Sequence, residues 1–248
     1  MKDAPGTLAT IEKLDGVDGR TLVQQAIDSI TAYIRSAKLK AGDGLPGEME
    51  FAQEFGVSRA VIREAFGALA ALRLIDVGNG RRARVATFDG AAFAAALGHA
   101  VSTWQVTVPQ VWDVRRTLER RTAALAALNR TEREAEDILG HARAMAANRR
   151  NFTRMTEHDI AFHQAIAAAC HNILFTQVIA SFSHLMMEAV PVAWRTRQTE
   201  EQRSIILKCH ADIAEAIADR DPTKAEHAMD RHFDDAVTRL LEAGYSRG

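Results

Sequence analysis

The sequence predicts a mostly α-helical protein of two domains, with a single β-hairpin in the first. Apolar residues recur at helical spacing through most of the chain, and only "LIDVGNGRRARV" has the alternation and turn residues of a hairpin. Beyond about Phe88 the helix-start signals continue, and no further strand pattern appears. These observations favour a small, mostly helical domain with one hairpin, followed by an all-α bundle.

The first domain is expected to span residues 20–87, after a polar, flexible tail at residues 1–19. A helix begins at Thr21 and ends at "KAGDGLP", where glycines and a proline interrupt it. A short helix is predicted over Gly47–Phe55, and Ser58 caps a longer one. The hairpin follows, with its turn at Gly78, Asn79 and Gly80.

The second domain is expected to span residues 89–244 as a bundle of about six or seven helices of roughly 15 to 23 residues. "TERE" at Thr131 and "TEEQ" at Thr199 are capping boxes. Pro109 and Pro222 suit the first turns of two further helices, and Gly244 suits the end of the last.

The charge is unevenly distributed. The net charge of the 248 residues is -1, yet residues 59–84 contain six arginines against Glu64 and Asp76. Such a basic patch indicates a polyanionic partner on one face. The two cysteines form no CxxC motif, and no apolar run approaches the roughly 20 residues of a membrane span. We therefore expect a cytoplasmic protein with no membrane partner.

Two helices separated by "FGVSR" and followed by an arginine-rich hairpin are typical of a winged helix-turn-helix. Arg59 and Arg63 are four residues apart, so both project from one face of the second helix, where arginine can read guanine. Ser58 can donate to a phosphate, and Gly80 lets the wing approach the minor groove beside Arg82. The alternative is a charged hairpin that binds nothing.

The run "LPGEMEFAQEFGVSRAVIREAFGALAALRLIDVGNGRRARV" resembles the DNA-binding domain of the GntR family of bacterial transcription regulators. The resemblance implies that Ser58, Arg59 and Arg63 contact double-stranded DNA, as do Asn79 and Gly80 in the wing. Many relatives have Ser or Arg where this chain has Met49, so no phosphate contact is expected there.

A second pattern lies in the predicted bundle. Asp159 and His163 are one helical turn apart, and His210 and His232 are each flanked by apolar residues in other helices. One carboxylate and three imidazoles form a complete ligand set for Zn²⁺ or another divalent cation such as Ni²⁺ or Mn²⁺. Among the other histidines, we expect His158 and His227 to be solvated and His141 to have no partner at ligand spacing.

"DIAFHQAIAAACHN", "CHADIAEAIADRD" and "KAEHAMDRHF" resemble the FCD effector domain of the FadR subfamily. The resemblance implies that the same four residues hold a metal and that its open positions accept an effector carboxylate. It also implies that Arg115 is the arginine of the first effector helix, and a guanidinium matches a carboxylate. Arg239 and Trp194 are further candidates for the effector site.

We therefore predict a homodimeric transcription regulator that binds a pseudopalindromic operator and responds to a sugar acid or another small organic acid. Repression relieved by ligand is the expected mode, and no enzymatic activity is expected. One alternative is a metal-dependent hydrolase with a nucleic-acid-binding appendage. Another is a constitutive DNA-binding protein whose metal is structural.

Overall fold

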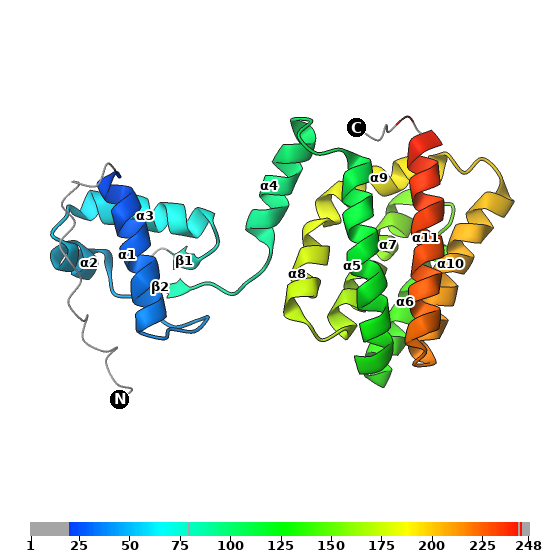
Figure 1. Ribbon diagram of the computed structural model, residues 1–248, viewed down its shortest axis with the longest axis horizontal. Helices are drawn as coiled ribbons and strands as arrows, with labels where there is room; N and C mark the ends of the chain where they lie inside the picture. Colours follow the sequence, from blue (N-terminus) through cyan, green and yellow to red (C-terminus); the bar gives the residue numbers. More distant parts are fainter. Residues whose placement is uncertain (1–19, 79, 243, 245–248) are drawn as a thin grey trace. The chain divides into compact units, whose positions relative to one another are not determined.

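In the computed structural model, which describes residues 20–78, 80–242 and 244, the chain divides into two compact units between Ala92 and Phe93 (Figure 1). The predictions for the tail at residues 1–19 and for Asn79 lie outside the described residues. Each unit has its own apolar core. The division falls inside helix α4, Ala91–Ser102.

Within residues 20–78, the N-terminal unit forms helices α1 (Leu22–Ser36), α2 (Glu48–Phe55) and α3 (Arg59–Ala71). Helix α3 packs against both α1 and α2, and the side chains between them, including Phe51, Ile62 and Leu69, are fully buried. Gly56 ends α2 with a φ of 68°, a left-handed conformation that glycine adopts without strain. The chain can therefore turn sharply from α2 into α3.

The hairpin pairs β1 (Ile75–Gly78) with β2 (Arg81–Val85) in antiparallel register, with Ile75 opposite Val85. The other edge of β2 hydrogen-bonds to the segment before α2, where Leu45 N lies 2.8 Å from Ala83 O. Gly80 has a φ of 71°, as the turn requires. This hairpin is the wing of a winged helix-turn-helix, as the sequence predicts.

The second unit is entirely helical over the residues that the structure describes. After α4, the helices are α5 (Val108–Asn129), α6 (Glu132–Ala147), α7 (Phe152–Ala169), α8 (Ile173–Ser181), α9 (Ser183–Arg195), α10 (Glu200–Ala218) and α11 (Pro222–Glu242). Helix α5 packs against α7, α10 and α11, while α7 also contacts α6, α8 and α9 (Figure 1). Helices α5, α7, α10 and α11 thus meet around one core.

The predicted helix starts are correct, but the predicted number of helices is not. Thr131 and Thr199 form capping boxes, and α11 begins at Pro222. Over its described residues, the second unit has eight helices rather than six or seven, and α4, α8 and α9 contain only 12, 9 and 13 residues. The break between α8 and α9 lies at Phe182, without a glycine or proline, so the local sequence does not signal it.

Of the helices described, none is long and apolar enough to cross a membrane alone. Only α8 and α9 together would pass a test of length and composition, and they are bent by 56°.

Candidate metal centre and nucleic-acid interface

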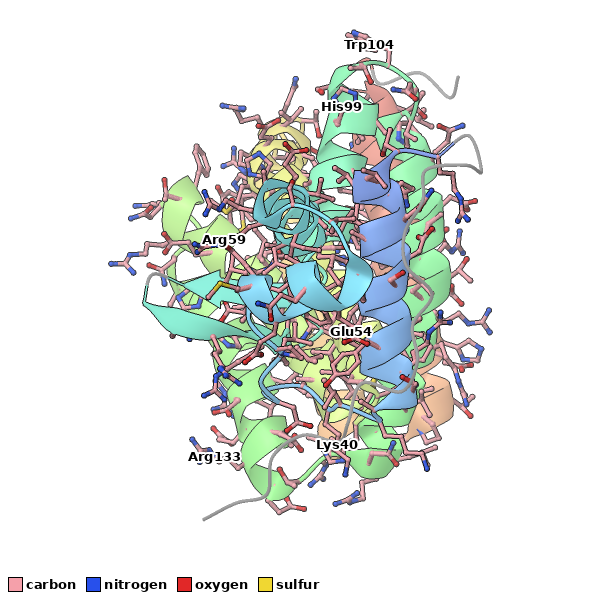
Figure 2. The ribbon with its side chains drawn as sticks, turned by 90° about the vertical axis from the view of Figure 1, so that its left-hand side faces the viewer. Lys40, Glu54, Arg59, His99, Trp104 and Arg133 are labelled. Atoms are coloured by element: carbon pink, nitrogen blue, oxygen red, sulfur yellow. The ribbon has the colours of Figure 1, made fainter. Side chains whose placement is uncertain are left out.

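The N-terminal end of α3 presents two arginines to solvent. Ser58 caps this helix, its side-chain oxygen accepting from the backbone N of Val61 at 3.4 Å. Arg59 and Arg63 follow on one face, and more than half of each side chain is exposed. Figure 2 shows Arg59 on the surface of this unit. The two guanidinium groups are therefore accessible to a large partner.

These arginines have intramolecular partners that the sequence analysis did not identify. Glu48, at the start of α2, lies 2.9 Å from Arg59 Nε and 3.5 Å from Arg63 Nε. In the wing, Arg82 lies 3.0 Å from Glu50. All three contacts are solvent-exposed pairs, which stabilise a protein by only about 0–1 kcal/mol each. A phosphate or a base can replace the carboxylate at little cost.

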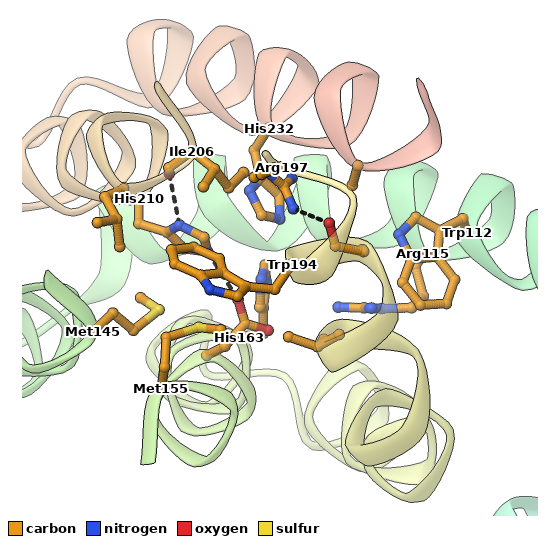
Figure 3. Close-up of a pocket in the computed structure, with 15 residues that line it drawn as sticks. Trp112, Arg115, Met145, Met155, His163, Trp194, Arg197, Ile206, His210 and His232 are labelled. Carbon is orange, nitrogen blue, oxygen red and sulfur yellow. Dashed lines mark hydrogen bonds and ion pairs between the residues drawn. The ribbon is translucent and has the colours of Figure 1, made fainter. Parts of the chain in front are cut away.

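The histidine cluster lies in the core of the second unit. His163 on α7, His210 on α10 and His232 on α11 are all buried, and one ring nitrogen of each lies within 4.8 Å of the others. The ring centroids of His210 and His232 are 4.5 Å apart. Three different helices thus direct imidazoles to one point (Figure 3).

Hydrogen bonds fix which nitrogen of His163 and His210 is free. The Nδ1 atom of His210 lies 2.9 Å from the carbonyl oxygen of Ile206, which can only accept, so this nitrogen carries the proton. The Nδ1 atom of His163 contacts the carboxylate of Glu119. In their neutral forms, both imidazoles therefore have an unprotonated Nε2, the form that ligates a metal.

Asp159 completes the arrangement. Its Oδ1 lies 3.1 Å from Nε2 of His210, and both atoms are acceptors when that imidazole is neutral. Two facing acceptors need a proton or a cation between them. Asp159 nevertheless lies outside the tight set of three nitrogens, which consists of the imidazoles alone.

The electrostatics of the cluster favour an anionic Asp159 and a neutral His232. Burial raises the pKa of Asp159, but a hydrogen bond from the protonated form of His210, together with the nearby His163 and Arg115, outweighs it, so this pKa is lowered. Burial, together with the neighbouring positive groups, holds the pKa of His232 well below its usual value. An anionic carboxylate, a neutral imidazole and three close ring nitrogens are what a divalent cation requires, so these residues fit a metal.

Glu119, which the sequence analysis overlooked, links the cluster to Arg115. Its Oε1 lies 2.7 Å from Arg115 Nε, its other oxygen contacts His163, and its side chain is 1% exposed. Burial raises the pKa of Glu119, but Arg115 and His163 more than compensate, so the pKa is lowered. The spacing of four residues between Arg115 and Glu119 on α5 was a visible signal.

A cavity of about 40 Å³ lies beside the histidines. Its walls include Arg115 and Trp194, as the sequence predicts, and also Arg197, which was not a candidate (Figure 3). Such a volume holds only a few water-sized groups, so the site suits a small occupant or opens to admit one.

Two expectations about individual residues need correction. Arg239 is absent from the walls of this cavity, and it interacts instead with Asp235 and Glu242 on its own helix. His158 is half-buried rather than solvated. Its Nδ1 atom lies 3.3 Å from Nδ1 of His141, which is also half-buried. They form a pair between α6 and α7, because these helices pack side by side.

Comparison with known proteins identifies both units. Residues 22–85 match the model of bacterial regulatory proteins of the gntR family, and residues 110–235 match the FCD domain. The chain belongs to the GntR family of bacterial transcription regulators and carries an FCD domain. It is therefore a DNA-binding regulator, and the hydrolase alternative is set aside.

Curated relatives cover most of this regulator. It is 30% identical to the HTH-type transcriptional regulator LutR of Bacillus subtilis, over 81% of this chain and 92% of LutR. It is 31% identical to the Glc operon transcriptional activator of Escherichia coli, over 86% of each chain. The galactonate operon transcriptional repressor of Escherichia coli is 28% identical, over 83% of this chain and 90% of the repressor. Both activators and repressors are thus among its relatives.

Among solved structures, the GntR protein of Streptococcus agalactiae has the same fold. It superposes with a TM-score of 0.65 at 21% sequence identity, covering 88% of this chain and 99% of that one.

The role of Glu119 can be tested by Glu119→Gln. Removing one partner of a buried ion pair leaves Arg115 uncompensated, so we expect a loss of about 3–5 kcal/mol in the free energy of unfolding. Glu136→Gln is the control, because Glu136 forms an ion pair with Arg143 in which both side chains are about two-thirds exposed. Urea unfolding of both variants measures the difference. Equal, small losses would show that Glu119 is not needed to hold Arg115.

Proposed function

We propose that this regulator is a homodimer that binds a pseudopalindromic operator and represses transcription until a small carboxylate enters the second unit. The observation that carries the proposal is the buried set of three imidazoles and a carboxylate beside an arginine-lined cavity. A constitutive regulator would have no need of such a cavity. Apolar side chains would fill the same space at lower desolvation cost.

The proposed metal ligands are His163, His210, His232 and Asp159. Nitrogen and oxygen donors in this number suit Zn²⁺, with Ni²⁺ or Mn²⁺ as alternatives. Glu119 orients His163 as a carboxylate behind a metal-binding imidazole commonly does. When bound, a divalent ion supplies a positive charge for one carboxylate oxygen of the effector.

Arg115 is the proposed second anchor of the effector. Arg115 is 4% exposed and lines the cavity, and its guanidinium points toward the histidines (Figure 3). Glu119 occupies its Nε, and the sulfur of Met186 contacts one terminal nitrogen. Donor capacity therefore remains on the guanidinium for an effector oxygen. Trp194 would close the cavity from α9.

The proposed DNA contacts come from Ser58, Arg59 and Arg63 at the start of α3, and from Asn79, Gly80 and Arg82 in the wing. An effector changes operator affinity only if it binds the released and DNA-bound states of the dimer with different affinity. A shift from almost complete binding to almost complete release requires a difference of roughly 10⁴-fold.

We expect Arg63→Ala to lose about 1–3 kcal/mol of discrimination between operator and unrelated DNA, because it removes a base-reading guanidinium. Arg82→Ala should weaken both DNAs alike and reduce the salt dependence of binding. Arg143→Ala is the control, since Arg143 is an exposed arginine of the second unit. Titrations at several salt concentrations give the values. Wild-type selectivity in Arg63→Ala would refute the base contact.

Purified protein is expected to contain about one divalent ion per chain, and a chelator should lower its melting temperature. The double variant His210→Ala, His232→Ala should contain none. His227→Ala should retain the metal, because His227 lies on the same helix as His232 but is exposed. Elemental analysis and thermal unfolding provide the measurements. If the wild-type protein contains no metal and its melting temperature does not change with the chelator, the proposed metal site is wrong.

Arg115→Lys tests the effector anchor, because it retains the charge beside Glu119 but loses the planar donor pair. We expect the effector concentration for half-maximal DNA release to rise by roughly tenfold. Arg116→Lys is the control, since Arg116 pairs with Asp230 and Asp234 at the surface. A panel of sugar acids and organic acids is scored by DNA release. If no acid in the panel causes release, the regulator is constitutive and the metal structural.

A further inference from the structure

A second buried ion pair lies at the cavity, apart from Arg115 and Glu119. Arg197, between α9 and α10, is 3% exposed and lines the cavity. One terminal nitrogen donates to the carbonyl oxygen of Ala193 at 2.7 Å, and the other contacts the carboxylate of Asp235 on α11. Arg197 therefore holds its position without any ligand (Figure 3).

Apart from the histidines, two donors that line the cavity have no acceptor. Among the described residues, Nε of Arg197 and Nε1 of Trp194 are buried and make no hydrogen bond. Both residues line the cavity. Buried N–H groups in folded proteins almost always have a partner, so unfilled donors at a cavity indicate a ligand that supplies an acceptor.

The charges around the cavity limit the kind of ligand that can supply this acceptor. Arg115 is neutralised by Glu119, and Arg197 by Asp235. Asp235 also approaches Arg239, but Glu242 in turn pairs with Arg239, so that group is neutral too. With neutral imidazoles, Asp159 and a divalent ion leave a net charge of one positive unit. A single carboxylate cancels it, whereas a second would remain buried and uncompensated.

We propose that the Arg197–Asp235 pair makes this pocket selective for a monocarboxylate that carries a hydroxyl or carbonyl oxygen at its other end. Arg197 Nε and Trp194 Nε1 donate to that neutral oxygen, and dicarboxylates of the same length are rejected because Asp235 has already neutralised Arg197. This inference rests on the proposed function, since it assigns the second end of the same effector.

The experiment compares two acids that differ at one end. Glycerate ends in a hydroxymethyl group, and tartronate has a carboxylate there. Binding of each to metal-loaded, full-length protein is measured by calorimetry. Wild type should bind glycerate at least roughly tenfold more tightly than tartronate, because the extra charge has no partner.

Asp235→Asn removes the charge that neutralises Arg197. The affinity for tartronate relative to glycerate should therefore rise by at least roughly tenfold. This change does not depend on the charge of the metal. Asp234→Asn is the matched control, because Asp234 is the preceding residue but is largely exposed and pairs with Arg116. It should leave the ratio unchanged.

If Asp235→Asn is unstable, the double variant Arg197→Gln, Asp235→Asn provides a second test. It restores a neutral pair, so it should recover the wild-type preference for glycerate. If wild type binds both acids equally, or if Asp235→Asn leaves the ratio of their dissociation constants unchanged, the proposed selectivity is wrong but the proposed effector site is not. If metal-loaded wild type binds DNA but neither acid nor any other carboxylate tested, the proposed effector site fails as well.

Discussion

The carboxylate of Glu119 is shared between the guanidinium of Arg115 and the imidazole of His163, and the rest of the cavity depends on this contact. It fixes the Nδ1 proton of His163, which leaves Nε2 available, and it holds Arg115 along α5. Because all three side chains are buried, each would carry a large desolvation cost without the others. The network is therefore coupled, and a change in one member alters the charge and orientation of the next.

This coupling gives a physical route by which a bound anion can alter the second unit. Helices α5, α7, α10 and α11 each contribute a charged or ligating side chain to the cavity, and α5 packs directly on the other three. Under the proposed function, an anion bound in the cavity would contact side chains from all four of these helices at once. Differential affinity of this kind is what a ligand needs in order to shift a conformational equilibrium.

In the DNA-binding unit, the ion pairs lie at the surface rather than in the core. Glu48 and Glu50 lie at the start of α2 and pair with Arg59, Arg63 and Arg82 across the face that would meet DNA. The pairs keep the arginines ordered and reduce the local positive charge, which limits non-specific attraction to polyanions. Since they are exposed, exchanging a carboxylate for a phosphate costs little.

The sequence alone determined the helix starts and the winged helix-turn-helix, because caps, turns and helical spacing are local properties. It also singled out Asp159, His163, His210 and His232, by ligand type and by resemblance to the FCD domain. It also singled out Arg115 and Trp194. The tertiary structure decided which charges compensate one another. The spacing of four residues between Arg115 and Glu119 is visible in "RRTLERR", but only their burial shows that they pair with each other. Arg197 meets Asp235 only because the segment after α9 packs on α11. Pairings between distant segments follow from packing, and one sequence without relatives carries no local sign of them.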